Sequence, residues 1–183
     1  MRIVILAGGE GRRIGGGKPL RMLGGRSLID RALDRARCWS DAVLVVAREG
    51  GDLRDDPAVE GPLGGVAAAL ALGGDVLTIP CDMPLLPDDL PVRLTSAKAA
   101  TLAASGGRLH PVCALWKAEA AAGLPAYLAT GRRSLKGFAE AVGYEAVEWP
   151  VEPYDPFFNI NEEADLARAE AILRDYILRS SRA

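Results

Sequence analysis

The N-terminal segment constrains the fold of this chain more than any other part of it. Residues 2–6 form a short apolar run, which stops at a glycine-rich stretch that reads LAGGEGRRIGGGK over residues 6–18. An apolar run that ends at paired glycines predicts a buried first strand followed by a tight loop. The chain is therefore expected to open with a strand whose carboxyl end carries this loop.

The composition of the loop favours an anion as its ligand. Glycines let backbone N–H groups approach an anion closely, because no Cβ stands in the way. Arg12, Arg13 and Lys18 bring three cations to the loop against a single acid, Glu10. Phosphate suits such surroundings. The stretch thus predicts a nucleotide or phosphate site, and a flexible glycine loop without a ligand remains the alternative.

The loop matches neither of the two common phosphate-binding fingerprints. A Walker A loop needs a serine or threonine after its lysine, and here Pro19 follows Lys18. Residues 9–13 break the spacing of a dinucleotide fingerprint, and Pro19 disfavours a helix that runs through the loop. The loop by itself therefore does not indicate which nucleotide binds.

Strand-like and helix-like segments alternate along the rest of the chain. Buried strands are predicted at residues 2–6, 41–47 and 75–79, with further strands at 100–104, 111–116 and 144–149. Helices are predicted at 27–36, 64–72, from 87, 118–129, 134–142 and 161–178, with Ser27 and Asn161 as N-caps. This alternation predicts a three-layer α/β/α fold with a mostly parallel mixed sheet, formed by residues 1–183 as one domain. Ligands are expected at the carboxyl ends of its strands.

Composition excludes several classes of protein. The net charge of −2 gives no support for nucleic-acid binding. Cys38, Cys81 and Cys113 lie far apart without a C-x-x-C pair, which disfavours structural zinc and a disulfide framework. Neither a signal peptide nor an apolar run of about 18 residues stands out, so no membrane contact and a cytoplasmic location are expected.

Two further motifs follow predicted strands. The sequence Gly61-Pro62-Leu63-Gly64-Gly65 opens a predicted helix, whose free N–H groups and glycine surface could receive a flat base. A plain turn before a helix is the alternative for this motif.

The second motif, Pro80-Cys81-Asp82-Met83-Pro84, places a carboxylate directly after a buried strand. Near phosphate oxygens Asp82 would be a Mg²⁺ ligand, because magnesium takes one or two carboxylates together with substrate phosphates. Capping of a turn by Asp82 is the alternative. A thiol enzyme based on Cys81 is disfavoured, because His110 is the one histidine of the chain and has no acid beside it in sequence.

Taken in order, five motifs resemble those of the molybdenum cofactor guanylyltransferases, which belong to the nucleotidyltransferase superfamily with a Rossmann-like core. The motifs are LAGGEGRRIGGGK, GPLGG, PCDMP, the pair His110-Pro111, and FNINEEADL at residues 158–166. The resemblance extends from Arg2 to about Leu173. It favours the guanylyl branch over the cytidylyl branch, which usually reads LAAG and lacks the GPL turn.

The resemblance implies that the chain transfers GMP from GTP to the phosphate of molybdopterin or Mo-molybdopterin and releases pyrophosphate. Molybdoenzymes or their chaperones are then candidate protein partners. Such a reaction needs two anions brought into line and neutralisation of the charge on pyrophosphate, rather than a nucleophile or a general base. Lys18, Arg13 and a Mg²⁺ cofactor held by Asp82 are the predicted catalytic set.

The resemblance also implies contacts for each substrate. The predicted GTP contacts are Leu6, Ala7, Gly8, Gly9, Lys18, Asp55, Gly61, Pro62, Leu63 and Asp82. The predicted acceptor contacts are His110, Arg133, Asn159 and Asn161. The N-terminal half is thus expected to bind nucleotide and the C-terminal half to bind the acceptor.

The chain departs from the family pattern at Gly17, where an aspartate usually precedes the loop lysine. Because of this departure, a non-catalytic nucleotide-binding homologue remains an alternative. A cytidylyltransferase or a sugar-phosphate nucleotidyltransferase of the same superfamily is the other alternative.

Overall fold

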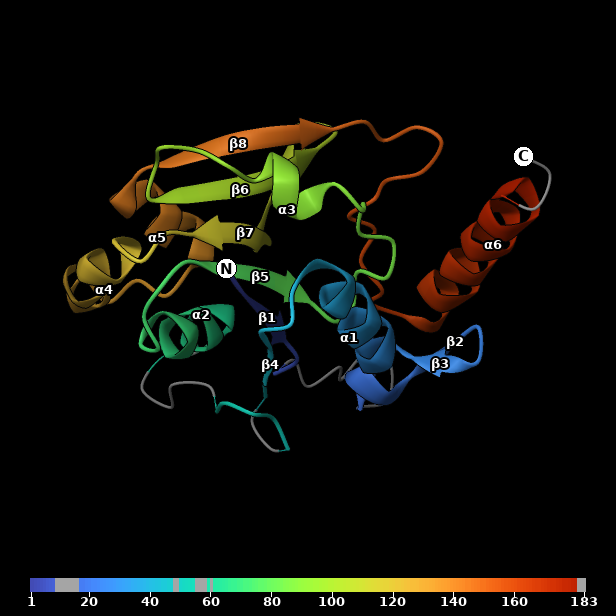
Figure 1. Cartoon of the computed structure of the whole chain (residues 1–183), viewed down its shortest axis with the longest axis horizontal. Helices are drawn as coiled ribbons and strands as arrows, with labels where there is room; N and C mark the ends of the chain where they lie inside the picture. Colours follow the sequence, from blue (N-terminus) through green and yellow to red (C-terminus); the bar gives the residue numbers. More distant parts are fainter. Residues whose placement is uncertain (9–16, 48–49, 55–58, 60, 181–183) are drawn as a thin grey trace.

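A six-stranded sheet forms the centre of the computed structural model, which describes residues 1–8, 17–47, 50–54, 59 and 61–180, with the backbone alone for 176–180 (Figure 1). The strand order is β4-β1-β5-β7-β6-β8. Strand β1 pairs in parallel with β4 and β5, and β6 pairs in parallel with β8, whereas β7 is antiparallel to β5 and β6. The strands are β1 (Arg2–Leu6), β4 (Val43–Val46), β5 (Val76–Pro80), β6 (Ala100–Ser105), β7 (Arg108–Trp116) and β8 (Tyr144–Trp149).

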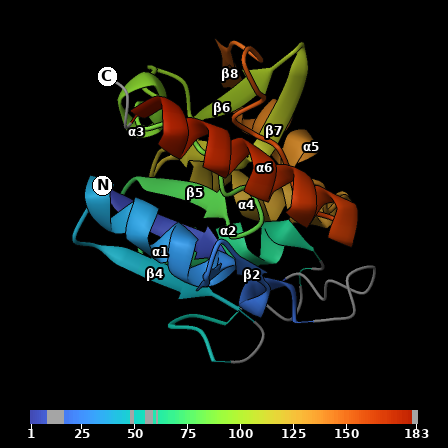
Figure 2. The same ribbon diagram turned by 90° about the vertical axis from the view of Figure 1, so that its right-hand side faces the viewer.

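Helices cover both faces of this sheet. Helices α1 (Leu28–Trp39) and α3 (Leu90–Arg93) pack on one face, and α2 (Pro62–Leu70), α4 (Ala120–Ala129) and α5 (Leu135–Val142) pack on the other. Figure 2 shows α1 and α5 on opposite sides of the strands. The alternation of side chains along β1 explains the two cores, because Ile3 and Ile5 pack with α1 while Val4 packs with Ala69 of α2. The predicted three-layer fold is confirmed.

Helix α6 (Glu163–Ser180) and a small hairpin lie beside the carboxyl end of β5 (Figure 1). The hairpin consists of β2 (Met22–Leu23) and β3 (Arg26–Ser27), and the one-turn helix η2 (Lys18–Leu20) precedes it. Leu166 and Ala169 of α6 pack against Leu23 and Leu28. The C-terminal helix therefore covers the segment that leads from the glycine-rich stretch into α1.

Local sequence signals explain where three helices begin. Ser27 caps α1 by accepting the Asp30 N–H at 3.1 Å, and Ser134 caps α5 by accepting the Gly137 N–H at 2.9 Å. Gly61 precedes α2 with φ of 75°, a conformation that L side chains rarely adopt, and Pro62 follows in the first turn.

The observed elements follow the predicted ones with three corrections. Strand β4 is an edge strand whose first three residues are half-buried, because the sheet ends there and one neighbour is missing. The helix expected from Pro87 is the single turn α3. The antiparallel pairing of β6 and β7 across Gly106 and Gly107 is as predicted, but β7 begins at Arg108, so that His110 lies within the strand.

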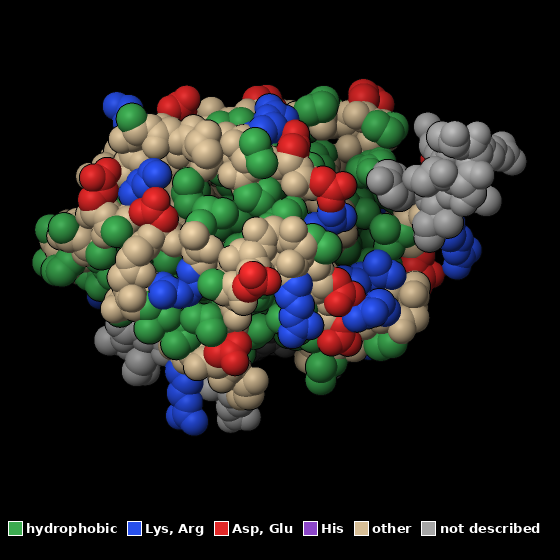
Figure 3. All heavy atoms as spheres, in the orientation of Figure 1, with side chains coloured by type: hydrophobic (Ala, Val, Ile, Leu, Met, Phe, Trp, Pro, Cys, Tyr) green, Lys and Arg blue, Asp and Glu red, His purple; other side chains and the backbone are tan. Residues whose placement is uncertain are grey.

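The distribution of charge on the surface agrees with the near-neutral composition. On the face drawn in Figure 3, basic and acidic side chains alternate over the described part of the chain. None of the helices in that part combines the length and the apolar character that crossing a membrane requires.

Candidate active site

Asp82 lies where β5 leaves the sheet. The Cys81 N–H donates to the Leu6 carbonyl at 3.3 Å, which holds the turn after β5 against the end of β1. Cys81 and Met83, on either side of Asp82, are buried in the core. The carboxylate therefore sits at the carboxyl ends of two parallel strands, where an α/β sheet binds its ligands.

Lys18 is the ion-pair partner of Asp82. Its Nζ lies 2.5 Å from Asp82 Oδ2, and the two side chains are only 11% and 19% exposed. Gly17, with φ of 59° and ψ of 28°, turns the backbone into η2 and so directs Lys18 inward. A largely buried pair of this kind leaves an uncompensated charge if one partner is removed.

Asn159 and Asn161 complete the surroundings of the lysine. Lys18 Nζ donates to Asn161 Oδ1 at 3.3 Å and lies 3.5 Å from Asn159 Oδ1. The Ile160 N–H between them donates to the Asp82 carbonyl at 2.9 Å. An ammonium group has three N–H donors, and the three acceptors match that number. We call these four residues, Lys18, Asp82, Asn159 and Asn161, the lysine cluster.

The contact with Lys18 corrects the predicted role of Asn161 as the N-cap of the last helix. Helix α6 begins at Glu163, and the Asp165 carboxylate accepts the N–H groups of Asn161 at 2.7 Å and Glu162 at 3.0 Å. Asp165 therefore satisfies the free donors that precede the helix, and the Asn161 side chain turns to the lysine.

One oxygen of Asp82 is left without a hydrogen bond in the part of the chain that the structure describes. Within the described residues Asp82 Oδ1 is buried and has no hydrogen-bond partner. A buried carboxylate oxygen without a partner is costly, and a hard cation would satisfy it. The same residues contain no group of three or more His, Cys, Asp or Glu side chains that could hold a metal. The donor set thus fits a divalent cation that completes its coordination with substrate phosphates.

Cys81 does not supply a nucleophile. Burial, reinforced by the nearby Asp82 charge, raises the pKa of the Cys81 thiol to about 12. A thiol that stays protonated at neutral pH is unreactive, which agrees with the chemistry expected from the sequence.

The predicted nucleotide contacts lie at two neighbouring places. Residues 6–8 continue from β1, with the Ala7 N–H already donated to the Val46 carbonyl at 2.8 Å. Gly61 and Pro62 are exposed at the start of α2. The Leu63 side chain is fully buried among the helices of that face, so only its backbone is available. Gly9, Arg13 and Asp55 lie outside the described residues.

Two of the predicted acceptor residues are not brought to the lysine cluster. His110 is buried, with its ring 4.8 Å from the Phe157 ring and Nε2 2.8 Å from Ser105 Oγ. Arg133 donates to the backbone carbonyls of Leu128 and Arg132, in the α4–α5 connection. That connection lies on the side of the sheet where β5 begins (Figure 1), opposite to Asp82. The geometry does not support either residue as a partner of the lysine cluster.

Sequence reasoning missed residues that hold the site together. Arg21 forms an ion pair with Glu163 and so ties η2 to the start of α6. Ser105 donates a partly buried hydrogen bond to Asp155 at 2.8 Å. Arg21 stands three residues after Lys18, and this closeness in sequence could have indicated that Arg21 belongs to the site. No spacing rule connects Ser105 with Asp155.

The site combines a lysine, an aspartate and two asparagines, which lie at the carboxyl ends of parallel strands beside a glycine-rich segment. Such a site is typical of α/β proteins that bind the phosphates of a nucleotide. Residues 3–142 match the family model described as the MobA-like NTP transferase domain, and the chain belongs to this family.

Curated relatives extend the match over almost the whole chain. A molybdenum cofactor guanylyltransferase of Rhodopseudomonas palustris (strain BisB5) is 42% identical over 197 residues, which cover 94% of each chain. One from Cereibacter sphaeroides is 41% identical and covers 93% of this chain and 96% of the relative. The resemblance inferred from the motifs is thereby confirmed.

Solved structures agree in fold. Molybdopterin-guanine dinucleotide biosynthesis protein A from Archaeoglobus fulgidus superposes with a TM-score of 0.78 at 26% identity, over 96% of this chain and all of the other. The 4-diphosphocytidyl-2C-methyl-D-erythritol synthase from Anaerococcus prevotii has a TM-score of 0.71 over 94% of this chain and 96% of the other. Its identity of 14% shows a shared fold only.

Proposed function

We propose that this chain transfers GMP from GTP to the phosphate of molybdopterin, which yields molybdopterin guanine dinucleotide and pyrophosphate. The observation that carries the proposal is the lysine cluster, in which a buried lysine meets a carboxylate at the carboxyl ends of β1 and β5. One oxygen of that carboxylate has no hydrogen-bond partner among the described residues. The relatives named molybdenum cofactor guanylyltransferase, at about 40% identity over more than nine-tenths of the chain, support the choice of nucleotide and acceptor.

The reaction requires one bond to form and one to break. A phosphate oxygen of the acceptor bonds to the α-phosphorus of GTP, and the bond from that phosphorus to pyrophosphate breaks. The acceptor phosphate is ionised at neutral pH, so no side chain has to remove a proton. The work left to the protein is to align two anions and to balance their charge.

Among the described cationic side chains, Lys18 is the one that lies in the lysine cluster. Its charge is balanced by Asp82 Oδ2. A phosphate oxygen at the cluster competes for the same ammonium group, and its arrival frees Asp82 for a cation. Mg²⁺, held by Asp82 and substrate phosphates, would offset the negative charge that grows on pyrophosphate.

Asn159 and Asn161 act through their uncharged amides. Their oxygens accept hydrogen bonds from Lys18. Their NH₂ groups are donors suited to phosphate oxygens, and an amide orients an anion without the strong trapping that a charged group exerts. We place them at the boundary between the nucleotide and the acceptor, which refines the expected division between the two halves of the domain.

The remaining assignments are predictions that follow from the same function. Gly9, Arg13 and Asp55 are expected on the nucleotide, molybdoenzymes or their chaperones are the expected recipients, and the cytoplasm is the expected location.

A direct assay tests the proposal. The purified chain is incubated with molybdopterin, Mg²⁺ and GTP, CTP, ATP or UTP in parallel, and the dinucleotide and pyrophosphate are quantified. We expect pyrophosphate release with GTP that depends on both molybdopterin and Mg²⁺. Preferential use of CTP would assign the chain to cytidylyl transfer, and GTP binding without turnover would identify a non-catalytic homologue.

A further inference from the structure

A chain of hydrogen-bonded polar side chains, buried at Ser105 and His110 and half-buried at Asp155, lies at the β6–β7 hairpin. Ser105 ends β6, His110 lies in β7, and both are buried, with 3% and 5% of their surface exposed. Ser105 Oγ is 2.8 Å from His110 Nε2 and 2.8 Å from Asp155 Oδ1. A buried serine that links an imidazole to a carboxylate is rarely present for packing alone, because an apolar residue would fill the space without hydrogen-bond requirements.

The hydrogen atoms of this chain can be assigned from its partners. An ionised carboxylate is an acceptor only, so Ser105 donates its one proton to Asp155. Ser105 Oγ must then accept from His110, which places the imidazole proton on Nε2. The direction of the chain is thus from His110 through Ser105 to Asp155.

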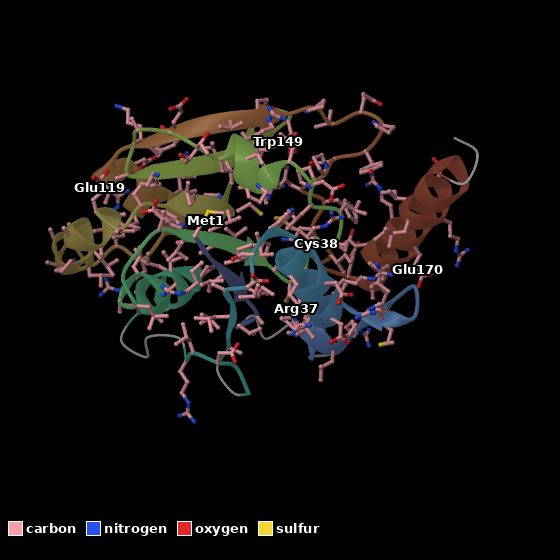
Figure 4. The ribbon with its side chains drawn as sticks, viewed as in Figure 1. Met1, Arg37, Cys38, Glu119, Trp149 and Glu170 are labelled. Atoms are coloured by element: carbon pink, nitrogen blue, oxygen red, sulfur yellow. The ribbon has the colours of Figure 1, made fainter. Side chains whose placement is uncertain are left out.

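Asp155 and His110 both contact Phe157, which belongs to the segment that carries the two asparagines. The Phe157 N–H donates to the same Asp155 Oδ1 at 2.9 Å. The Phe157 ring stacks on His110 and meets Trp149 edge-on, with ring centroids 5.4 Å apart. Trp149, labelled in Figure 4 beside α3, is itself fixed by donating Nε1 to Asp89 Oδ1 at 2.9 Å. Phe157 is therefore held by a backbone hydrogen bond and by two contacts of its ring, one with His110 and one with Trp149.

One residue, Phe158, separates Phe157 from Asn159 of the lysine cluster, and Ile160 lies between Asn159 and Asn161. Ile160 is fully buried, and its N–H is bonded to the Asp82 carbonyl. A segment fixed at Phe157 and at Ile160 leaves the two asparagine side chains little freedom.

We propose that His110, Ser105 and Asp155 are positioning residues, which hold residues 157–161 in place and so keep the amides of Asn159 and Asn161 against Lys18 and Asp82. We refer to them as the His110 relay. The relay gives His110 a place in the site without contact with the acceptor. Its effect on turnover rests on the proposed function, but its effect on the segment does not.

Hydrogen exchange in the substrate-free protein tests the relay without any assay of activity. In Ser105→Ala, the amides of residues 157–161 should exchange about tenfold faster than in the unsubstituted chain, because local opening is no longer opposed by Asp155 and His110. The amides of β5 should keep their protection. The matched control is Thr101→Val, which removes another buried hydroxyl from β6, one that has no partner within the described residues. Unchanged exchange in Ser105→Ala, or equal acceleration in the control, would overturn the relay.

A pair of substitutions at His110 separates positioning from packing. His110→Gln keeps a donor at the place of Nε2, whereas His110→Phe keeps the stacking on Phe157 and loses the donor. We expect His110→Gln to retain kcat within about threefold, and His110→Phe to lose roughly tenfold, the range of one buried hydrogen bond to a polar partner. Equal losses in both variants would show that the hydrogen bond does not position the site.

The two readouts fail separately. Absence of GMP transfer by the unsubstituted chain would remove the proposed function, and the exchange measurement would still decide whether the relay holds residues 157–161. Normal transfer with unaltered exchange in Ser105→Ala would remove the relay alone.

Discussion

Lys18 and Asp82 form an ion pair, with Nζ 2.5 Å from Oδ2, between the one-turn helix η2 and the turn that follows β5. This pair joins the glycine-rich segment to the carboxylate motif, although the two are far apart in sequence. The charge of Lys18 is thus balanced by the same residue that is proposed to hold a cation. In our proposal a substrate phosphate separates the pair, because it competes with Asp82 for the Lys18 ammonium group.

Asp82→Asn is expected to abolish transfer in a chain that still folds, although the loss of the ion-pair partner of Lys18 lowers its stability. The amide matches the carboxylate in shape but removes the charge that balances Lys18 and holds Mg²⁺. Loss of a metal that offsets charge on a leaving group costs several kcal/mol, so kcat should fall about a thousandfold or more. Steady-state assays with circular dichroism as a check on folding measure this. Asp34→Asn, at an exposed ion pair with Arg26, is the control and should be active. Retention of a tenth of the activity in Asp82→Asn would place the metal elsewhere.

Lys18→Met is expected to weaken GTP binding without changing the preference among bases. A lysine acts on phosphate as a point charge and does not read a purine edge. Methionine keeps the aliphatic stem, so the variant isolates the charge. Calorimetric titration with GTP and CTP should show both affinities reduced by a similar factor. A large relative gain for CTP would contradict the separation of phosphate and base contacts.

Substitutions at the start of α6 separate capping from the active site. Asp165→Asn removes a charged acceptor that serves two N–H groups, and should lower the free energy of unfolding by about 1 kcal/mol, or the melting temperature by about 2–4 °C. Asn161→Ala should leave the melting temperature nearly unchanged and reduce turnover, because its side chain faces Lys18 rather than the helix. The reverse pattern in thermal denaturation would restore Asn161 as the cap.

The stability of the fold should depend on pH through His110. Burial lowers the pKa of His110 below its ordinary value of 6.5, with Arg108 acting in the same direction and Asp155 and Glu148 opposing it. A depressed histidine pKa means that the unfolded chain binds the proton more readily. The contribution of neutral His110 to stability is therefore complete above about pH 6.5 and is lost as the pH falls through the lower folded-state pKa.

Urea denaturation between pH 7 and pH 5 tests this dependence. The unsubstituted chain should lose more stability over that interval than His110→Gln, which cannot titrate. Parallel losses in the two proteins would show that another group controls the acid limb.

The sequence predicts most of the sheet, because strands such as β5 and β6 are short, largely apolar runs that end at proline or before glycine, and those signals are local. It also identifies Lys18 and Asp82 individually. It does not predict that the two side chains form an ion pair. It also does not predict that Asn161 accepts a hydrogen bond from Lys18 instead of capping α6, because an asparagine before a helix fits the capping pattern equally well. The burial of His110 is another tertiary fact, since Ser105, Asp155 and Phe157 meet it only after the strands have assembled.

A crystal structure with GTP and Mg²⁺ tests the central claim most directly, through the distance between Lys18 Nζ and Asp82 Oδ2. We expect the 2.5 Å pair to open, with Nζ on a phosphate oxygen of GTP and an Asp82 oxygen on the metal. Bound GTP with the pair intact and the metal on other residues would contradict the account.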